Sequence, residues 1–343
     1  MYEAFYGFSG KPFQLNPDPT FYYGSKGHTS AYSYLQYGVY QSEGFIVVTG
    51  DIGTGKTTLV RALLEQLDPS KVIAVQLVST LIDADDLLKA VATAFGIPIK
   101  GTEKAELLGT LEAFLTSLVG QSKRALLIVD EAQNLTPRAL EELRMLSNFQ
   151  FGDRALLQSF LVGQPELRQL LQAPTMEQLR QRVIASYHLG PLAADETAAY
   201  IQHRLHHVGW NPESLVFDAT AYAAIHAATG GIPRKINTLA NRLLLSAYLA
   251  EKRAITGADV NAVTREISGE LGAGHARKPT GAGSPELVRE SVARNNGALA
   301  AISARLDRIE RTLALLLEAI RPEAVPKSER RTGGTKSGRQ ARL

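Results

Sequence analysis

One eight-residue segment constrains the fold of this chain more than any other part of the sequence. Residues 50–57 read Gly-Asp-Ile-Gly-Thr-Gly-Lys-Thr, which fits the pattern G-x-x-x-x-G-K-[ST]. An apolar, β-branched run precedes it at 45–49, and a helical pattern follows it from Thr58. A strand, a glycine-rich turn and a helix in this order are typical of a loop whose backbone N–H groups surround phosphates. A glycine-rich turn that contains Lys-Thr by chance is the weaker alternative, because both flanking elements are present.

The residue types in this segment suit a nucleoside triphosphate. Its glycines let the backbone turn its N–H groups inward, where a Cβ would crowd a phosphate. Lys56 can reach the β- and γ-phosphates, and the hydroxyl of Thr57 can ligate Mg²⁺. The start of the following helix adds partial positive charge. We therefore predict a triphosphate site formed by Gly50, Asp51, Ile52, Gly53, Thr54, Gly55, Lys56, Thr57 and Thr58.

Length and composition narrow the class of protein. The chain has 343 residues, enough for about two domains. It has no cysteine, which excludes disulfides and thiolate metal sites and suits a reducing cytoplasm. Neither a secretion leader nor an uncharged apolar run of about 18 residues is visible. We expect a cytoplasmic protein whose contact with a membrane goes through partners or surface charge.

The positive net charge belongs to one end of the sequence. The total is +3, but residues 326–343 alone carry +5, which leaves −2 for all the others. Such a tail can contact an anionic membrane, nucleic acid or an acidic partner, and a solvated disordered end is the plain alternative. The basic balance therefore does not indicate a nucleic-acid-binding core.

Strand and helix patterns alternate up to Pro191. Five apolar runs predict buried strands, at 45–49, 72–78, 125–129, 156–162 and 183–189. Helical patterns separate them, at 57–67, 84–95, 103–119, 137–147 and 165–182. This alternation forms βαβ units. We expect an α/β nucleotide-binding domain with a five-stranded parallel sheet over residues 1–191.

The next segment, 192–268, is helical in pattern throughout and predicts an all-α domain. Asp195 is placed to cap one of its helices, Asp218 precedes an alanine-rich helix, and Thr256 opens the last.

Three further segments follow. Residues 269–298 begin with a Gly-, Ala- and Pro-rich stretch and predict a flexible linker. Residues 299–321 carry apolar side chains in steps of three and four, which predicts a coiled-coil-like helix. An amphipathic helix that docks on its own chain is the alternative. Residues 322–343 are expected to form a disordered basic tail.

A second motif follows the third predicted strand. The run 125–129 is apolar and ends in Asp130 and Glu131. Two acids at the carboxyl end of a buried strand form a Walker B pattern, in which Asp130 holds Mg²⁺ and Glu131 orients and deprotonates the attacking water. Strands often end in acids, but the loop upstream makes this pairing specific. It favours hydrolysis over binding alone.

A third motif, Gly-Gly-Ile-Pro-Arg at 230–234, lies in the helical segment. The glycines can end one helix and Pro233 can begin the next, which places Arg234 in its first turn. An arginine at a helix start can be directed at a γ-phosphate. An ordinary surface arginine is the alternative.

Together these motifs resemble those of an AAA+ ATPase with a C-terminal helical lid. More narrowly, residues 1–268 resemble the ExeA/GspA-type secretion ATPases, and within them those associated with exosortase (PEP-CTERM) and exopolysaccharide loci. The matching stretches are 5–8, 12–13, 17–19, 21–23, 44–50, 130–134, 163–167 and 179–182. The resemblance implies that ATP and Mg²⁺ are the ligands. It gives no reason to expect the peptidoglycan-binding region of ExeA-type proteins in this chain.

The resemblance also implies roles for residues outside the three motifs. Gln164 takes the sensor 1 position and Arg234 the sensor 2 position. Arg180 or Arg182 is the finger that reaches the nucleotide of a neighbouring subunit. The segment from 12 to 28 is expected near the adenine, with its aromatics Phe21, Tyr22 and Tyr23 either there or in the core.

Three histidines at 203, 206 and 207 suggest a metal site, but no H-E-x-x-H pattern or third ligand is evident. A solvated helix face is the better interpretation.

Three functions remain after these observations. The first is an AAA+ ATPase that drives or regulates an envelope secretion or polysaccharide-export system as a homo-oligomer, in the cytoplasm or at the inner-membrane periphery. The second is a DNA-dependent ATPase of the transposition-accessory type. The third is a nucleotide-gated adaptor without hydrolysis, which an intact Asp130-Glu131 pair argues against.

Overall fold

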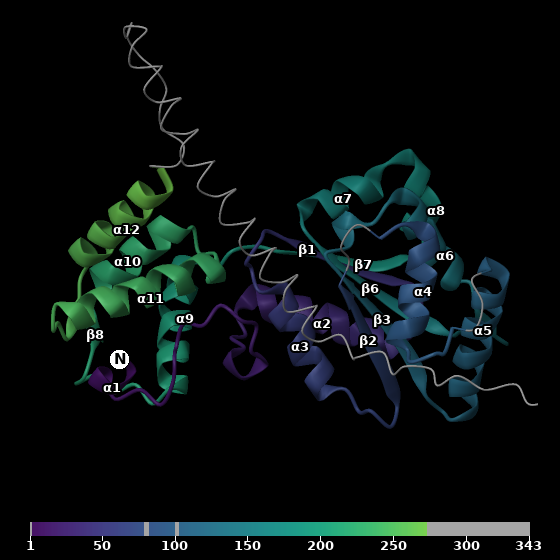
Figure 1. Ribbon diagram of the computed structural model, residues 1–343, viewed down its shortest axis with the longest axis horizontal. Helices are drawn as coiled ribbons and strands as arrows, with labels where there is room; N and C mark the ends of the chain where they lie inside the picture. The colour runs from purple at the N-terminus through teal and green to yellow at the C-terminus, as the bar shows by residue number, and fades with distance from the viewer. Residues whose placement is uncertain (1, 79–81, 100–102, 273–343) are drawn as a thin grey trace, which may run out of the picture. The chain divides into compact units, whose positions relative to one another are not determined.

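A computed structural model describes residues 2–78, 82–99 and 103–272 of the chain (Figure 1). Its central element is a five-stranded parallel sheet in the order β2-β3-β6-β1-β7. The strands are β1 (Phe45–Gly50), β2 (Val72–Val78), β3 (Arg124–Asp130), β6 (Leu157–Gly163) and β7 (Val183–Leu189). All five predicted strands are present, each within one residue of the expected bounds. The α/β fold with a five-stranded parallel sheet is confirmed.

Helices cover both faces of this sheet, and the alternation of side chains along the strands explains how. In β1, Phe45 and Val47 pack with one set of helices, whereas Ile46 and Val48 pack with the other. The first face carries α4 (Ala84–Ala94), α5 (Lys104–Gly120), α6 (Pro137–Leu146) and α7 (Pro165–Gln172). The second carries α2 (Lys26–Gln41) and α3 (Lys56–Gln66). The inner strands β1, β3 and β6 are therefore buried on both faces, and they are mainly apolar, although β6 also buries Gln158 and Ser159.

The edge strands are less buried than the sequence suggested. β7 alternates between partly buried and exposed side chains, and β2 is only partly buried. An edge strand has a neighbour on one side alone, so its side chains and backbone meet more solvent. A short hairpin, β4 (Gln150–Phe151) and β5 (Arg154–Ala155), precedes β6 and was not predicted.

The single helix predicted at 165–182 is wrong. The structure has α7, then a 3-10 turn η3 (Pro174–Met176) and a short α8 (Glu177–Arg180). Pro174 explains the break, because a proline cannot donate a helical hydrogen bond and its ring crowds the preceding turn.

The helical domain contains α9 (Ala194–His207), α10 (Ala219–Thr229), α11 (Pro233–Leu249) and α12 (Gly257–Gly272), with a small pair β8 (Val216–Phe217) and β9 (Ala254–Ile255). Asp218 precedes α10, as expected, and also caps it, since its side chain accepts from the backbone N–H of Ala221. The cap predicted at Asp195 is wrong, because α9 starts at Ala194 and Asp195 lies in its first turn. The linker was also predicted to begin too early, since α12 includes its first four residues, 269–272.

The start of the N-terminal segment packs with the helical domain, whereas its later part contacts both the helical domain and α3. The segment contains α1 (Tyr2–Tyr6) and η1 (Pro19–Phe21), whose aromatic side chains join the core formed by α9 to α12. Tyr6 is 1% exposed and its hydroxyl donates to the carbonyl of Lys252. The sequence placed all of 1–191 in one domain. By its packing, the start of the chain belongs with the helical domain.

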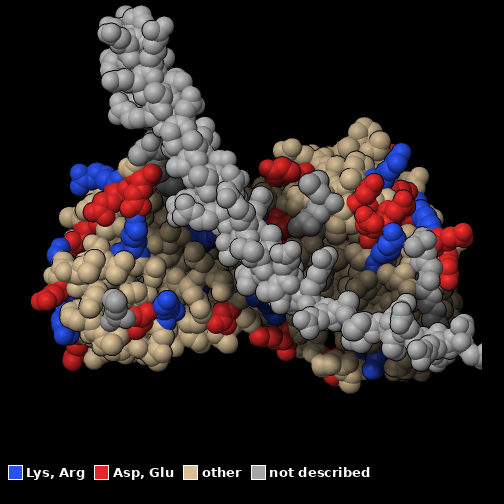
Figure 2. Space-filling model, viewed as in Figure 1, with Lys and Arg blue, Asp and Glu red and all other residues tan. Residues whose placement is uncertain are grey.

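The remaining expectations concern charge, membranes and the C-terminal segments. On the face shown in Figure 2, acidic and basic side chains of the described residues are interspersed. None of the described helices combines the length and the apolarity needed to cross a bilayer. The rest of the predicted linker from 273, the heptad helix at 299–321 and the basic tail at 322–343 lie outside the described residues.

Candidate nucleotide-binding site

The predicted phosphate-binding loop connects β1 to α3, as its flanking patterns indicated. Gly53 and Gly55 adopt φ angles of 86° and 99°, which other residues rarely tolerate. The imidazole of His28, on α2, lies directly against the loop, and its Nε2 is 3.0 Å from the carbonyl oxygen of Thr54. A Cβ on Gly55 would come within 2.8 Å of that ring. The loop therefore needs glycine at 55 both for its backbone angle and for the histidine beneath it.

Lys56 is buried and bonds to its own loop. Its Nζ donates to the carbonyl oxygens of Gly50, at 2.7 Å, and Asp51, at 2.9 Å. Burial lowers the pKa of Lys56, although the carboxylates of Glu131 and Asp130 act in the opposite direction. The ammonium thus lies inside the curve of the loop, where a bound phosphate would supply a stronger acceptor than a carbonyl.

The loop meets the second motif at Thr57. The hydroxyl of Thr57 donates to Oδ2 of Asp130 at 3.0 Å, and Gln76, on β2, reaches the same oxygen at 3.3 Å. Asp130 is 3% exposed and ends β3. A hydroxyl and a carboxylate are the hard oxygen donors that Mg²⁺ prefers, and their proximity fits a shared Mg²⁺ ion.

Glu131 has an unusual backbone. Its φ and ψ are 53° and 38°, in the left-handed region. Its Oε2 accepts from Nε2 of Gln133, at 2.6 Å, and from Nε2 of Gln164, at 3.1 Å. Burial raises its pKa, but these two hydrogen bonds and the charge of Lys56 lower it, and the net shift is downward. Glu131 is therefore held as a carboxylate that lines the pocket.

The helical domain contributes Arg234. The prediction that glycines end one helix and that Pro233 begins the next is confirmed. Gly230 ends α10 in the left-handed conformation, Pro233 begins α11, and Arg234 follows in the first turn. Its backbone N–H donates to the carbonyl of Gly53 at 3.1 Å, so the helical domain contacts the phosphate-binding loop itself. A Cβ on Gly53 would lie 2.5 Å from the Cβ of Arg234.

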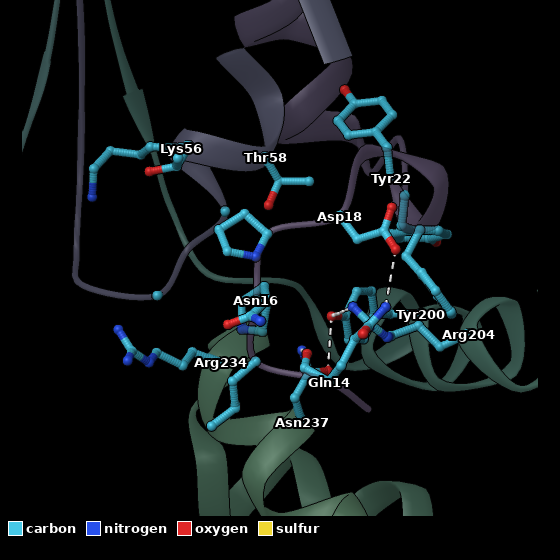
Figure 3. A pocket seen from close by; sticks show the side chains of 18 of the residues that line it. Gln14, Asn16, Asp18, Tyr22, Lys56, Thr58, Tyr200, Arg204, Arg234 and Asn237 are labelled. Carbon is cyan, nitrogen blue, oxygen red and sulfur yellow. Dashed lines mark hydrogen bonds between the residues drawn. The ribbon is translucent and has the colours of Figure 1, made fainter. Parts of the chain in front are cut away.

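These elements surround a cavity of about 180 Å³ (Figure 3). In this view, Lys56 and Thr58 come from one side and the helical-domain residues from the other, with Gln14 and Asn16 of the N-terminal segment between them. The side chains that line the cavity include Gln14, Asp18, Tyr22, Tyr200, Arg204 and Asn237.

A polar network joins the N-terminal segment to the helical domain at the end of this cavity away from Lys56. Tyr200 donates to Oδ1 of Asn237 at 2.9 Å and accepts from Arg204 at 3.0 Å. Asn237 donates to the carbonyl of Gln14, and Arg204 donates to the carbonyl of Pro12. These bonds fix the wall of the cavity opposite the phosphate-binding loop.

The segment expected near the adenine does line the cavity. Residues 14–18 and Tyr22, Tyr23 and His28 form part of its wall. Phe21 also reaches it, but only 8% of its surface is exposed, and it packs under the guanidinium of Arg204 at 4.6 Å. Phe21 therefore belongs mainly to the core, whereas its neighbours face the cavity.

The two finger candidates bond to their own chain. The guanidinium of Arg180 donates to the carbonyls of Leu171 and Ala173. That of Arg182 donates to the carbonyl and hydroxyl oxygens of Ser147, at the end of α6. Neither lines the cavity of its own subunit.

Of the three histidines of α9, His206 and His207 are exposed and His203 is partly buried, and each also lies beside an aromatic ring. His207 lies 4.1 Å from the ring of Phe21, His203 lies 5.5 Å from that of Tyr23, and His206 lies 5.0 Å from that of Trp210. Among the described residues, no group of three or more His, Cys, Asp or Glu side chains is placed to hold a metal ion.

Sequence reasoning missed three residues of this site, namely His28, Gln76 and Gln133. Gln76 is a single polar residue in an apolar strand, and Gln133 follows the acid pair by two positions, so both left a faint signal. His28 was expected only as the last residue of the segment near the adenine, and nothing indicated its contact with the loop, because its partner Thr54 is 26 residues away.

The sequence is similar to a known family and to a curated protein. The AAA-domain family matches residues 39–171. General secretion pathway protein A of Aeromonas hydrophila is 39% identical over 270 residues, which cover 78% of this chain and 49% of that protein. The chain thus spans about half the length of this curated relative.

Solved structures with low sequence identity share the fold. Cdc6p of Pyrobaculum aerophilum has a TM-score of 0.56 at 18% identity, over 77% of this chain and 71% of that chain. ORC2 of Aeropyrum pernix, in ADPNP and ADP complexes, has a TM-score of 0.53 at 15% identity, over 70% and 66%. Residues 39–171 thus match the AAA-domain family, and the chain shares the fold of these solved structures.

Proposed function

We propose that this chain is an AAA+ ATPase that serves an envelope secretion system. One observation carries the chemical part of the proposal. The Thr57 hydroxyl and the Asp130 carboxylate meet at 3.0 Å, and Glu131 follows directly. Two separate motifs thereby converge where the terminal phosphate of ATP and its metal ion would lie.

Each residue has a definite part in this proposal. The loop N–H groups of 50–58 and the ammonium of Lys56 bind the phosphates. Thr57 and Asp130 hold Mg²⁺, which neutralises charge on the β- and γ-phosphates. Glu131, which is ionised at neutral pH, accepts a proton from the attacking water.

Two further residues respond to the γ-phosphate. Gln164 directly follows β6 and donates to Glu131, and in this proposal it contacts the attacking water. Arg234 lies on the helical domain and is bonded through its backbone to the loop. Loss of the γ-phosphate would therefore change what holds the helical domain against the α/β domain, which gives a nucleotide-dependent motion.

We assign the finger to Arg180 or Arg182 of a neighbouring subunit, so that activity requires a homo-oligomer. Either side chain would have to leave the carbonyl groups that it now contacts. Arg180→Ala and Arg182→Ala should lower hydrolysis per subunit at high protein concentration, whereas Arg168→Ala, on the exposed surface of α7, should not. Normal hydrolysis by both variants would overturn the role in trans.

The proposed link to an envelope secretion system is based on sequence similarity. The similarity to general secretion pathway protein A supports a link to secretion. The finer assignment to exopolysaccharide export with exosortase (PEP-CTERM) proteins comes from the motifs alone. We place the chain in the cytoplasm, at the periphery of the inner membrane.

A turnover assay tests the chemical part. The wild-type chain should release phosphate from ATP only with Mg²⁺, and Glu131→Gln should bind ATP but release phosphate at least about 100-fold more slowly. Equal rates for the two proteins would refute the assignment of Glu131. Stimulation of the wild-type rate by DNA would favour a DNA-dependent ATPase over a secretion role.

A further inference from the structure

Gln133 makes contacts that its place in the sequence does not explain. It lies in a 3-10 turn, η2 (Ala132–Asn134), just after the acid pair. Its Nε2 donates to Oε2 of Glu131 at 2.6 Å, and its Oε1 accepts from the backbone N–H of Gln164 at 2.9 Å. The side chain of Gln164 donates to the same Oε2 of Glu131 at 3.1 Å. Three hydrogen bonds thus close a ring through three side chains.

The orientation of the Gln133 amide is determined by this ring. One end faces a carboxylate, which only accepts, and the other faces an N–H group, which only donates. Reversing the amide would break both bonds at once. The ring therefore specifies glutamine, since a carboxylate at 133 would repel Glu131 and an apolar side chain would bond to neither partner.

The side chain of Gln133 has room for these contacts because residue 163 is a glycine. A Cβ on Gly163, the last residue of β6, would come within 2.6 Å of Oε1 of Gln133 and 3.3 Å of its backbone nitrogen. The glycine lets the turn after β3 pack tightly against the end of β6. Two strands that are adjacent in the sheet are thereby joined through Gln133 at the edge where the nucleotide site lies.

We propose that Gln133 is a positioning residue for hydrolysis, which holds the Glu131 carboxylate and couples it to Gln164. This rests on the proposed role of Glu131. Because both amides bond to Oε2, Oε1 is the oxygen that accepts from the attacking water. A shift of Gln164 on contact with the γ-phosphate is transmitted to the carboxylate through two bonds. Gln133 itself touches neither ATP nor water.

Single substitutions give the first test. Gln133→Leu, of similar volume, removes both bonds, and we expect kcat for ATP hydrolysis to fall about 10- to 100-fold. The dissociation constant of a fluorescent ATP analogue should change less than about twofold, because the phosphate-binding loop is untouched. Gln133→Glu keeps the acceptor for Gln164 and should lose at least as much kcat. Gln169→Leu, on the exposed face of α7, is the matched control and should keep the wild-type kcat.

A double-mutant cycle separates positioning from a structural role. If Gln133 acts through the Glu131 carboxylate, Gln133→Leu should leave the slow single-turnover hydrolysis of Glu131→Gln unchanged. An equal fold-loss in both backgrounds would mean a general effect on the fold and would overturn the proposal. Should Gln133→Leu not fold, Gln133→Glu carries the same cycle.

The outcomes distinguish this inference from the function on which it rests. If wild type and Glu131→Gln hydrolyse ATP equally, the proposed function fails. If Glu131→Gln is slow but both Gln133 variants turn over like wild type, only the positioning role of Gln133 fails.

Discussion

The two ends of the proposed nucleotide pocket are built in different ways. The phosphate end consists of two short contiguous segments, 50–57 and 130–131, each placed by the strand that it follows. The opposite end consists of single residues from distant parts of the chain, such as Gln14, Tyr200 and Asn237. At the first end, local backbone geometry supplies the chemistry. At the second end, long-range packing does.

This difference has energetic consequences. At the phosphate end, the backbone of the loop supplies the N–H groups. Their direction depends on the glycines of the loop and little on its other side chains. The opposite end depends on a buried arginine, Arg204, which is 6% exposed and has no acidic partner among its hydrogen bonds. A buried charge of this kind is costly unless its hydrogen bonds are kept. Substitutions should therefore impair chemistry at one end and folding at the other.

The largest effect is expected at the phosphate end. Lys56→Ala removes the only ammonium in the loop, so we expect ATP hydrolysis to fall at least about 100-fold with little change in thermal unfolding. Phosphate release and a melting curve on the same samples measure both. Lys71→Ala, at an exposed ion pair, should be neutral in both. A Lys56→Ala protein that is fully active would remove the contrast between the two ends.

The contact between the loop and the helical domain should give the next largest effect. Gly53→Ala places a Cβ 2.5 Å from that of Arg234, which pushes α11 off the loop, and we expect about a 10-fold loss of hydrolysis. Gly96→Ala is the matched control, because its φ of 72° is equally unfavourable but its Cβ would meet nothing within 4 Å. Equal losses in the two variants would show that strain, not the contact, matters.

At the opposite end we expect a loss of stability. Tyr200→Phe leaves Asn237 and a buried N–H of Arg204 without their bonds to the hydroxyl, which should lower the free energy of unfolding by about 1–2 kcal/mol. Urea unfolding measures this, with Tyr40→Phe, at 79% exposure, as the control. If hydrolysis by the folded variant falls as far as in Lys56→Ala, this end is not mainly structural.

The smallest effect concerns pH and His28. Burial lowers the pKa of His28 below 6.5, although the Thr54 carbonyl and Glu196 act in the opposite direction. The unfolded chain then binds more protons than the folded one just below pH 6.5, so the free energy of unfolding falls as the pH drops through this range. His28→Gln should show less acid destabilisation between pH 7.5 and 5.5 than wild type, as measured by thermal melting. The exposed histidine variant His206→Gln should melt like wild type across this range.

The sequence alone predicted the parts that depend on neighbouring residues. The five strands, the loop at 50–57, the acid pair and the Gly-Gly-Ile-Pro-Arg turn all follow from patterns a few residues long. The sequence-based prediction was wrong at Pro174, a helix-breaking residue that interrupts the expected helix. It also overestimated the burial of β7, because burial depends on the position of a strand in the sheet. The sequence did not distinguish Arg180 from Arg182 as the finger. In the structure, both guanidinium groups bond to carbonyls of their own chain.

What the sequence determined by itself is therefore the phosphate end, because a strand, a glycine turn and a helix fix its geometry locally. Only the tertiary structure decided that the N-terminal aromatics belong to the helical domain, that His28 supports the loop and that Gln133 joins Glu131 to Gln164. The physical reason is that these contacts join elements far apart in the chain or on different strands. Such contacts exist only when the whole core has packed.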